Sequence, residues 1–473
     1  MAKYFRLNPY LEITAFLTAI AFHLWLLFHT TFVDWPEMLV YPWFLSKGML
    51  YYRDVVLAYV PGSYYLLHGL YSLLGYSPGS ERAIAYGFIL LTDWLVYVVS
   101  RKVTKSGLMG IIALFFFVLW QPIFSGNTIW YETILAPLYL LTYLLLLGYI
   151  ERPRLSRVLL VGAILGIATL IKQTAIWPLA FICLFIWLTG KEKRSSFFHA
   201  VAIGAVTVVM QGISWGYFAL QGAGVEYGFW VFGFLGFLSG QSSMYALAPP
   251  RSDLTLIAPA LIPFAALILS PMKKERLLLI VFTVAVLLAG LPRWGLHRLQ
   301  PMLAFIAVGL SFLGAVDYHK KNTRIVLLVF AICLTILGSW RSFRVFVTLR
   351  DPMQPTFFTA KYESLVSYLD DHAPGSLYVL GNYDYVYFGR NETPVVLPWV
   401  PLFPWNGKVP GMEDRLIRSL EAAKPEYILY APFHPPNKYY DGYAPEALFL
   451  YVSAKYEKIG APPAEGGELL RRK

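Results

Sequence analysis

Apolar runs about as long as a bilayer is thick alternate with shorter polar stretches over roughly the first 345 residues. The runs lie near 11–33, 83–100, 106–123, 133–150, 156–171, 174–190, 197–220, 254–271, 277–292, 299–316 and 324–345. A spanning helix needs about 17 to 25 apolar residues, so several runs are only just long enough. The pattern predicts an all-α polytopic membrane protein with about eleven transmembrane helices.

Lys and Arg gather in every second connection between these runs, as in the clusters 101–105 and 273–276. Cytoplasmic loops of membrane proteins carry this excess of positive charge. We therefore expect a multi-pass protein of the plasma membrane with a cytoplasmic amino terminus. The long polar connections then lie on the outer face.

The first outer loop, residues 34–82, is the longest of these connections and has helical periodicity of its own. Met38, Tyr41, Leu45 and Met49 are spaced as on one face of a helix. Residues 61–75 predict a second surface helix. A loop of this length inside a compact protein usually has a function.

The composition changes after residue 345 toward Pro, Asp, Glu and Tyr. We expect a transmembrane domain over 1–345 and a small extracytoplasmic α/β domain over 346–473. Short apolar runs predict buried strands at 376–380 and 427–430, and an amphipathic pattern predicts a helix over 412–423.

The composition agrees with a membrane protein, since 57% of the residues are hydrophobic and only 14% are charged. The net charge of +11 does not indicate nucleic acid, because the positive-inside pattern explains most of the basic residues.

Cys183 and Cys333 both lie in apolar runs, which argues against a disulfide framework. No histidine pair has metal-ligand spacing near an acid, so a dedicated zinc site is not expected. His23 and Asp93, inside spans, are interpreted as interhelical hydrogen-bonding groups.

Asp34 and Glu37 follow the first apolar run and lie three residues apart. On a helix both carboxylates point to the same side, where either one is a candidate general base. The alternative is a capping box, with Asp34 as the N-cap and Glu37 at the third helical position.

Glu132 begins the fourth run at its outer end and is a second acidic candidate, although a first-turn acid also favours the helix dipole. Lys172 interrupts an apolar segment at the outer end of the fifth run and is either a phosphate ligand or a snorkelling side chain. Arg293, His297 and Arg298 cluster on the side that otherwise lacks positive charge. They indicate an anionic partner, with salt bridges to outer acids or lipid headgroups as the alternative.

Together these residues suit glycosyl transfer from a lipid-phosphate sugar. A carboxylate accepts the proton of the acceptor hydroxyl, whose oxygen attacks the anomeric carbon with inversion, and cations stabilise the departing phosphate. The predicted phosphate ligands are Arg53, Lys172, Arg293, His297 and Arg298. The predicted lining of the substrate groove is Trp35, Tyr52, Asp54, Tyr59 and Tyr64.

Four stretches resemble the C-type membrane glycosyltransferases of the protein O-mannosyltransferase and lipid A aminoarabinose transferase branch. They are Asp34 after the first span, KGMLYYRDVV with VPGSYYLLHGLYSLLG, IWYETILAPLYLL, and GAILGIATLIKQTAIWPL. The resemblance implies that Asp34 is the catalytic acid or base, that Glu132 matches a second acidic position and that the donor is a polyprenyl-phosphate sugar. Many relatives have Glu where this chain has Trp35, and some have lysine where it has Val60.

The sequence leaves several alternatives. A transporter or flippase for a lipid-linked substrate would also need outer cations, but we found no internal repeat of the kind that many transporters have. The acceptor is a lipid, a glycan or a protein, and membrane lipids are further partners. No cofactor is certain, although a divalent cation, Mg²⁺ or Mn²⁺, could bridge Asp34 and Glu132.

Overall fold

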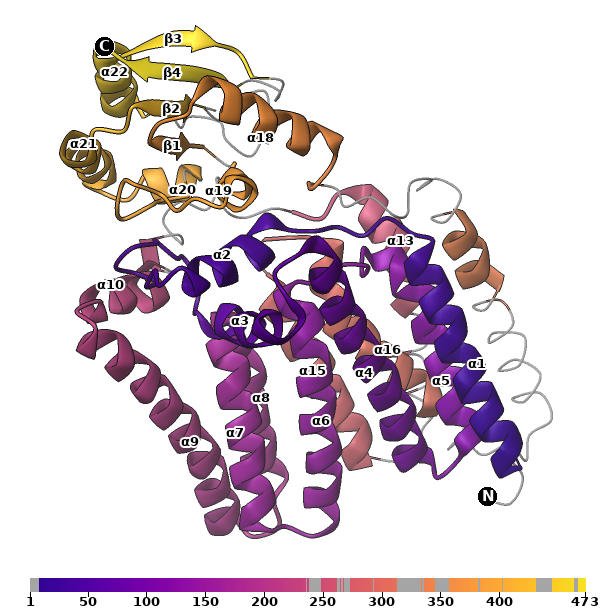
Figure 1. Cartoon of the computed structure of the whole chain (residues 1–473). Helices are drawn as coiled ribbons and strands as arrows, with labels where there is room; N and C mark the ends of the chain where they lie inside the picture. Colours follow the sequence, from indigo (N-terminus) through magenta and orange to yellow (C-terminus); the bar gives the residue numbers. More distant parts are fainter. Residues whose placement is uncertain are drawn as a thin grey trace. The chain divides into compact units, whose positions relative to one another are not determined.

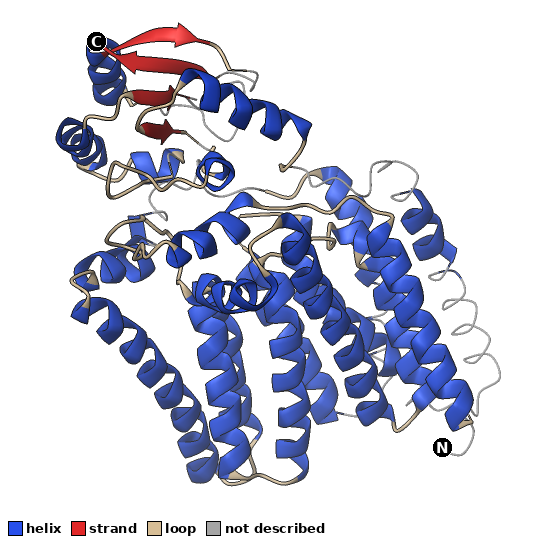
Figure 2. Cartoon of the chain, in the orientation of Figure 1, coloured by secondary structure: helices blue, strands red, loops and turns tan. Residues whose placement is uncertain are grey.

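The computed structural model describes residues 8–234, 236–237, 248–261, 264, 267, 273–291, 293–312, 333, 336–344, 357–381, 383–401, 403–430, 445–462 and 467–473. The fold is mostly helical with one small sheet (Figure 2). The chain divides into two compact units. Unit one comprises Met1–Val33, Arg82–Gln211 and Ala248–Gln354, and unit two comprises Asp34–Glu81, Gly212–Leu247 and Pro355–Lys473.

The long helices labelled in Figure 1 account for the first ten apolar runs, at least in part. They are α1 (Pro9–Phe28), α4 (Pro78–Thr104), α5 (Gly107–Trp120), α6 (Tyr131–Glu151), α7 (Leu155–Ile171), α8 (Ile176–Thr189), α9 (Lys193–Leu220), α13 (Arg251–Leu261), α15 (Lys273–Gly290) and α16 (Gln300–Ser311). The last run, 324–345, lies mostly outside the described residues, as does the end of 254–271. Among the described residues, four helices, α1, α4, α6 and α9, are long and apolar enough to cross a membrane. The count of about eleven spans therefore stays a prediction.

Local sequence explains where several of these helices begin. The side chain of Asn8 accepts a hydrogen bond from the backbone of Tyr10 at the start of α1, and Pro9 occupies the first helical position. Ser106 caps α5 in the same way, accepting from the backbone N–H of Met109.

Helix α16 forms the centre of unit one. All of its side chains are buried, and it packs against α5, α6 and α15. A helix that is apolar on every side is stable only when other helices surround it. Elsewhere in unit one, His23 Nδ1 lies 2.7 Å from Asp93 Oδ2 and joins α1 to α4, so both residues are interhelical hydrogen-bonding groups, as predicted, and the structure adds that they bind each other.

Unit two contains a four-stranded sheet, β1 (Leu377–Leu380), β2 (Tyr427–Tyr430), β3 (Tyr456–Gly460) and β4 (Glu468–Arg472), in the order β1-β2-β4-β3. The first two strands are parallel and fully buried, and the other pairs are antiparallel. Its helices include α18 (Ala360–His372), α19 (Tyr385–Arg390), α20 (Pro404–Gly407), α21 (Met412–Ala423) and α22 (Glu446–Lys455), besides α10 (Gly224–Gly228) and the π-helix η3 (Phe229–Gly233). Both predicted strands and the predicted helix over 412–423 are confirmed.

The first outer loop belongs to the same unit as this sheet. It forms α2 (Pro36–Ser46), which ends three residues before Met49, and α3 (Gly62–Leu74), which pack against each other. Backbone hydrogen bonds of 2.8 Å join Val56 N–H to Trp399 O and Trp399 N–H to Asp54 O. Since Trp399 also packs on Tyr41 and Phe44 of α2, loop and C-terminal residues share one aromatic core.

Candidate active site

Asp34 is a fully buried carboxylate in unit two. Its Oδ1 accepts a hydrogen bond of 2.8 Å from the backbone N–H of Phe357, and its Oδ2 accepts one of 3.4 Å from that of Phe358. The N-cap of α2 is Trp35, with no side-chain cap, so the capping-box alternative is wrong. Backbone donors stabilise an ionised carboxylate, and they fix the direction of this one.

Two neighbours of Asp34 were also predicted to belong to the site. The ring of Trp35 packs 5.9 Å from that of Phe357, centroid to centroid. Glu37 lies in the first turn of α2 and is half-buried. The structure thus brings Asp34, Trp35 and Glu37 together at the start of one short helix.

Arg53 and Asp54 form an ion pair at a turn of the first loop. Arg53 Nη2 lies 2.8 Å from Asp54 Oδ2, which also accepts from the backbone N–H of Leu50 at 2.8 Å. Burial by itself raises the pKa of Asp54. The hydrogen bonds from Arg53 and Leu50 and the charge of Arg53 together outweigh that effect, so the pKa lies below its ordinary value. The side chain of Arg53 is 51% exposed, so a phosphate group could reach it only in competition with Asp54.

Two of the three predicted groove tyrosines, Tyr52 and Tyr64, lie in the aromatic core of unit two, and Tyr59 is half-buried. Tyr52, at a positive φ of 67°, donates from its hydroxyl to the carbonyl of Tyr59 at 2.7 Å and packs edge-on against Phe218 and Tyr227. Tyr64 is buried against Tyr41 and Tyr51. Their part in a substrate groove stays a prediction.

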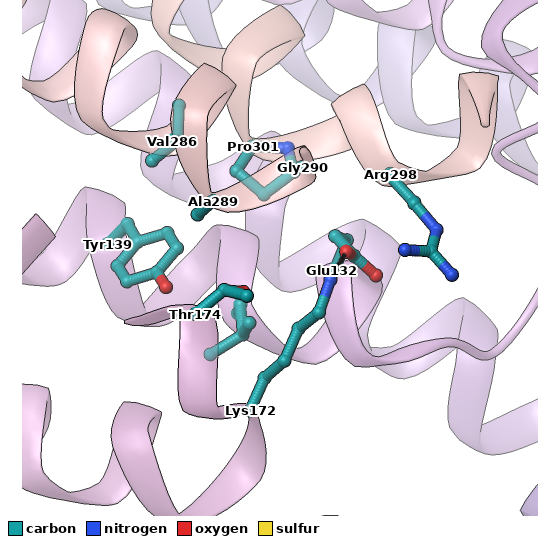
Figure 3. A pocket seen from close by; sticks show the side chains of 10 residues that line it. Glu132, Tyr139, Lys172, Thr174, Val286, Ala289, Gly290, Arg298 and Pro301 are labelled. Carbon is teal, nitrogen blue, oxygen red and sulfur yellow. Dashed lines mark hydrogen bonds and ion pairs between the residues drawn. The ribbon is translucent and has the colours of Figure 1, made fainter. Parts of the chain in front are cut away.

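A second group of predicted site residues lines a narrow pocket in unit one (Figure 3). Glu132 is the second residue of α6, and Lys172 follows the last residue of α7. Lys172 Nζ donates to Glu132 Oε1, and both residues are almost fully buried, with 5% and 3% exposure. The snorkelling alternative for Lys172 is therefore wrong. The lining is Glu132, Leu135, Tyr139, Lys172, Thr174, Val286, Ala289, Gly290, Arg298 and Pro301.

Arg298 and His297 come from the short 3₁₀ helix η5 (Leu296–Leu299) that leads into α16. Arg298 is 9% exposed and lines the pocket with Lys172 and Glu132. His297 packs edge-on against Trp130. Burial and the charges of Arg298, Lys172 and Arg293 lower the pKa of His297 well below its usual value, so this imidazole is neutral at pH 7. Burial also lowers the pKa of Lys172, an effect that Glu132 opposes.

Tyr139 and Thr174 belong to the same pocket and were not found from the sequence. Glu132 Oε2, Tyr139 Oη and Thr174 Oγ1 are buried polar atoms without a hydrogen-bond partner among the described residues. Such atoms are uncommon in folded proteins and mark a polar ligand or ordered water. Tyr139 follows Glu132 by two helical turns, a spacing that could have indicated it.

The predicted site residues therefore fall into two sets, one in each unit. Asp34, Glu37 and the Arg53–Asp54 pair belong to unit two, and Glu132, Lys172, Arg293, His297 and Arg298 belong to unit one. The described residues contain no group of three or more His, Cys, Asp or Glu side chains placed to hold a metal ion.

Residues 59–215 match the family model described as dolichyl-phosphate-mannose-protein mannosyltransferase. Among solved structures, ArnT from Cupriavidus metallidurans bound to undecaprenyl phosphate aligns with a TM-score of 0.62 at 10% identity, covering 98% of each chain. The oligosaccharyltransferase AglB from Archaeoglobus fulgidus, in complex with an inhibitory peptide and a dolichol-phosphate, aligns with a TM-score of 0.53 at 12% identity, covering 89% of this chain and 69% of that one.

The arabinofuranosyltransferase AftD from Mycobacteria aligns with a TM-score of 0.52 at 14% identity, covering 99% of this chain and 40% of that one. No curated protein sequence matches the chain. The match to the family model and the shared fold agree with the resemblance seen in the sequence. Residues 59–215 are thus similar to the protein O-mannosyltransferase family, and the chain shares the fold of the C-type membrane glycosyltransferases ArnT, AglB and AftD.

Proposed function

We propose that this chain is an inverting glycosyltransferase that moves a sugar from a polyprenyl-phosphate donor to an acceptor hydroxyl on the outer face of the membrane. The observation that carries the proposal is the burial of Lys172 and Arg298 in one pocket of unit one. Buried cations are costly in a membrane protein, and two of them beside one carboxylate leave a positive charge that an anionic substrate would balance.

The reaction assigns a different role to each set of residues. Asp34 accepts the proton of the acceptor hydroxyl, and the acceptor oxygen forms a bond to the anomeric carbon from the face opposite the phosphate. The bond between the anomeric carbon and the phosphate oxygen breaks, which leaves the lipid phosphate with an additional negative charge. Lys172 and Arg298 stabilise that charge, and single donors of this kind contribute about 10²- to 10³-fold in rate.

Glu132 takes a positioning role in this mechanism, since its carboxylate already binds Lys172. A carboxylate beside a buried amine favours the charged ammonium form, which a phosphate ligand requires. Glu132 also fixes the place of a side chain that otherwise has free rotation about four bonds. Asp34, rather than Glu132, is therefore the proposed base.

The relatives support a lipid-phosphate donor. The matched family is described by a dolichyl-phosphate-mannose substrate, and the ArnT and AglB structures hold undecaprenyl phosphate and dolichol-phosphate. By analogy, the donor here carries its sugar, a hexose or a pentose, on a polyprenyl phosphate. The acceptor is a lipid, a glycan or a protein.

The proposal is tested with the full chain in sealed liposomes, supplied with labelled polyprenyl-phosphate hexoses and pentoses and a cell-envelope extract as acceptor. Asp34→Asn should lower transfer by about 10²- to 10⁴-fold. Its remaining side-chain oxygen can still accept from Phe357, so apparent melting temperatures should stay close to the unsubstituted protein. Asp371→Asn, at an exposed position of α18, is the matched control and should transfer normally.

Normal transfer by Asp34→Asn would refute the role of this carboxylate. A flippase would move the lipid-linked sugar across the bilayer intact. Absence of sugar transfer and of free lipid phosphate, with the donor still crossing the membrane, would therefore replace the enzyme with the transporter alternative.

A further inference from the structure

A basic cavity lies in unit one at the end of α4. It shares no lining residue with the pocket of Figure 3. It is lined by Tyr97, Val98, Arg101, Lys102, Lys105 and Glu151. In Figure 1, the end of α4, the start of α1 and the connection from α6 to α7 lie at the same end of unit one. Nothing in the proposed reaction uses these residues.

Acidic partners hold two of the cations in place. Glu12 of α1 accepts from the hydroxyl of Tyr97 and lies 3.2 Å from Arg101 Nε, while Lys102 Nζ lies 3.1 Å from Glu151 at the end of α6. Residue 107 is a glycine, so no Cβ there competes with the carboxyl group of Glu12 for this position. Three helices and the start of a fourth thus fix the wall of the basic cavity.

Lys105 differs from the other two cations. It is exposed, it follows the last turn of α4 at a positive φ of 55°, and no acid pairs with it within the part of the chain that the structure describes. Three cations and two carboxylates leave one positive charge in this group, contributed by Lys105. The basic cavity therefore has a cation available for one phosphate oxygen.

The same face of α4 is apolar farther from its end. Leu91, Trp94, Val98 and Arg101 follow one another by three or four residues, which places them on one stripe of the helix, and Lys105 follows the helix directly at the basic end of that stripe. Leu91 and Trp94 are exposed, at 41% and 48%. An exposed stripe that changes from apolar to basic at the helix end complements an amphiphile with an anionic head and an acyl chain.

We propose that the basic cavity binds the phosphate of an anionic phospholipid, whose acyl chain lies along Leu91 and Trp94. A free phosphate ion would use the cations but not the apolar half of the stripe. The headgroup of a zwitterionic lipid carries a positive charge beside its phosphate, so Lys105 would add little to its binding energy. The site is separate from the donor pocket, and it holds whether or not the transfer reaction is confirmed.

The test measures lipid retention by the purified full chain, using native mass spectrometry after titration with phosphatidylglycerol or phosphatidylcholine of equal chain length. We expect phosphatidylglycerol to be retained preferentially. Lys105→Gln should weaken its retention about fivefold, and Arg101→Gln with Lys105→Gln about 25-fold, since each cation near a membrane surface contributes a similar factor. Lys191→Gln, an exposed basic residue outside the basic cavity, is the control and should have no effect.

Equal retention of the two lipids would overturn the proposal, as would an equal loss in the Lys191→Gln control, which would indicate diffuse attraction to all basic residues. Full displacement of phosphatidylglycerol by millimolar inorganic phosphate would assign the site to a free anion and would refute the phospholipid as its ligand. Lys105→Gln breaks no ion pair, so its fold should be intact, and an unchanged melting temperature checks this directly.

Discussion

The buried ion pair between Glu132 and Lys172 leads to a prediction in which one variant regains thermal stability but not sugar-transfer activity. Consider Lys172→Met, Glu132→Gln and the double substitution. The two side chains are 5% and 6% exposed, and Glu132 Oε2 has no other hydrogen-bond partner among the described residues. Lys172→Met therefore removes the ammonium that binds the buried Glu132 carboxylate and leaves Arg298 as the remaining cation among the residues that line the pocket.

Removing one partner of a buried ion pair costs about 3–5 kcal/mol, whereas replacing both partners is often neutral or stabilising. For domains of 150 to 250 residues, 1 kcal/mol corresponds to about 2–4 °C in melting temperature. Each single substitution should thus lower the apparent melting temperature by roughly 10 °C, and the double substitution should recover most of that loss. The coupling between the two positions is then about 3 kcal/mol or more.

The assay is tryptophan fluorescence during heating of the detergent-solubilised chain at pH 7.5, with Lys191→Met as an exposed control. Sugar transfer is measured in parallel, and Lys172→Met should be inactive both alone and in the double variant, because the phosphate ligand is absent from both. Losses that add in the double variant, or a Lys172→Met protein as stable as the unsubstituted one, would refute the buried-pair reasoning. Transfer by the stable double variant would refute the phosphate role of Lys172.

Two further predictions concern unit two. Burial raises the pKa of Asp384 from its ordinary 3.8 to about 7. The folded state therefore resists ionisation of this carboxyl, so its stability is highest below pH 4 and falls as pH rises through 7, by about 4 kcal/mol in total. Asp384→Asn should raise the melting temperature of this unit at pH 8 and leave it unchanged near pH 4; the same shift at both values would contradict the assignment. Arg53→Gln should change the melting temperature by only about 2 °C, since exposed ion pairs contribute about 0–1 kcal/mol. If Arg53 binds donor phosphate, this variant should raise the KM for the donor several-fold, and an unchanged KM would remove Arg53 from the phosphate ligands.

The positions of helices and strands followed closely from the sequence, because they depend on local patterns. Helix α21 has the predicted bounds, Met412–Ala423, and β2 has the predicted Tyr427–Tyr430. The amphipathic spacing of its residues predicts α21, and a short apolar run predicts β2, each from a few neighbouring residues. The family resemblance was also visible in the sequence, since it depends on short contiguous stretches.

The functional contacts were less accessible, because they join residues that are distant in the chain. The sequence identified Glu132 and Lys172 as separate candidates, and their pairing across 40 residues appears only in the fold. The capping alternative for Asp34 was reasonable locally, but a backbone N–H 323 residues away binds this carboxylate instead. Thr174 carries no unusual local signal, and Tyr139 is marked only by its spacing of two helical turns from Glu132, so the pocket is what distinguishes both from core residues.

By itself, the sequence predicted a helical membrane protein, because burial of apolar surface and the placement of positive charge act on contiguous segments, and it showed a resemblance to membrane glycosyltransferases in four short stretches. The tertiary structure decided which charges are paired, which are buried and which line a cavity. Those properties depend on the packing of α6 against α7, α15 and α16, and no periodicity within a single segment encodes them.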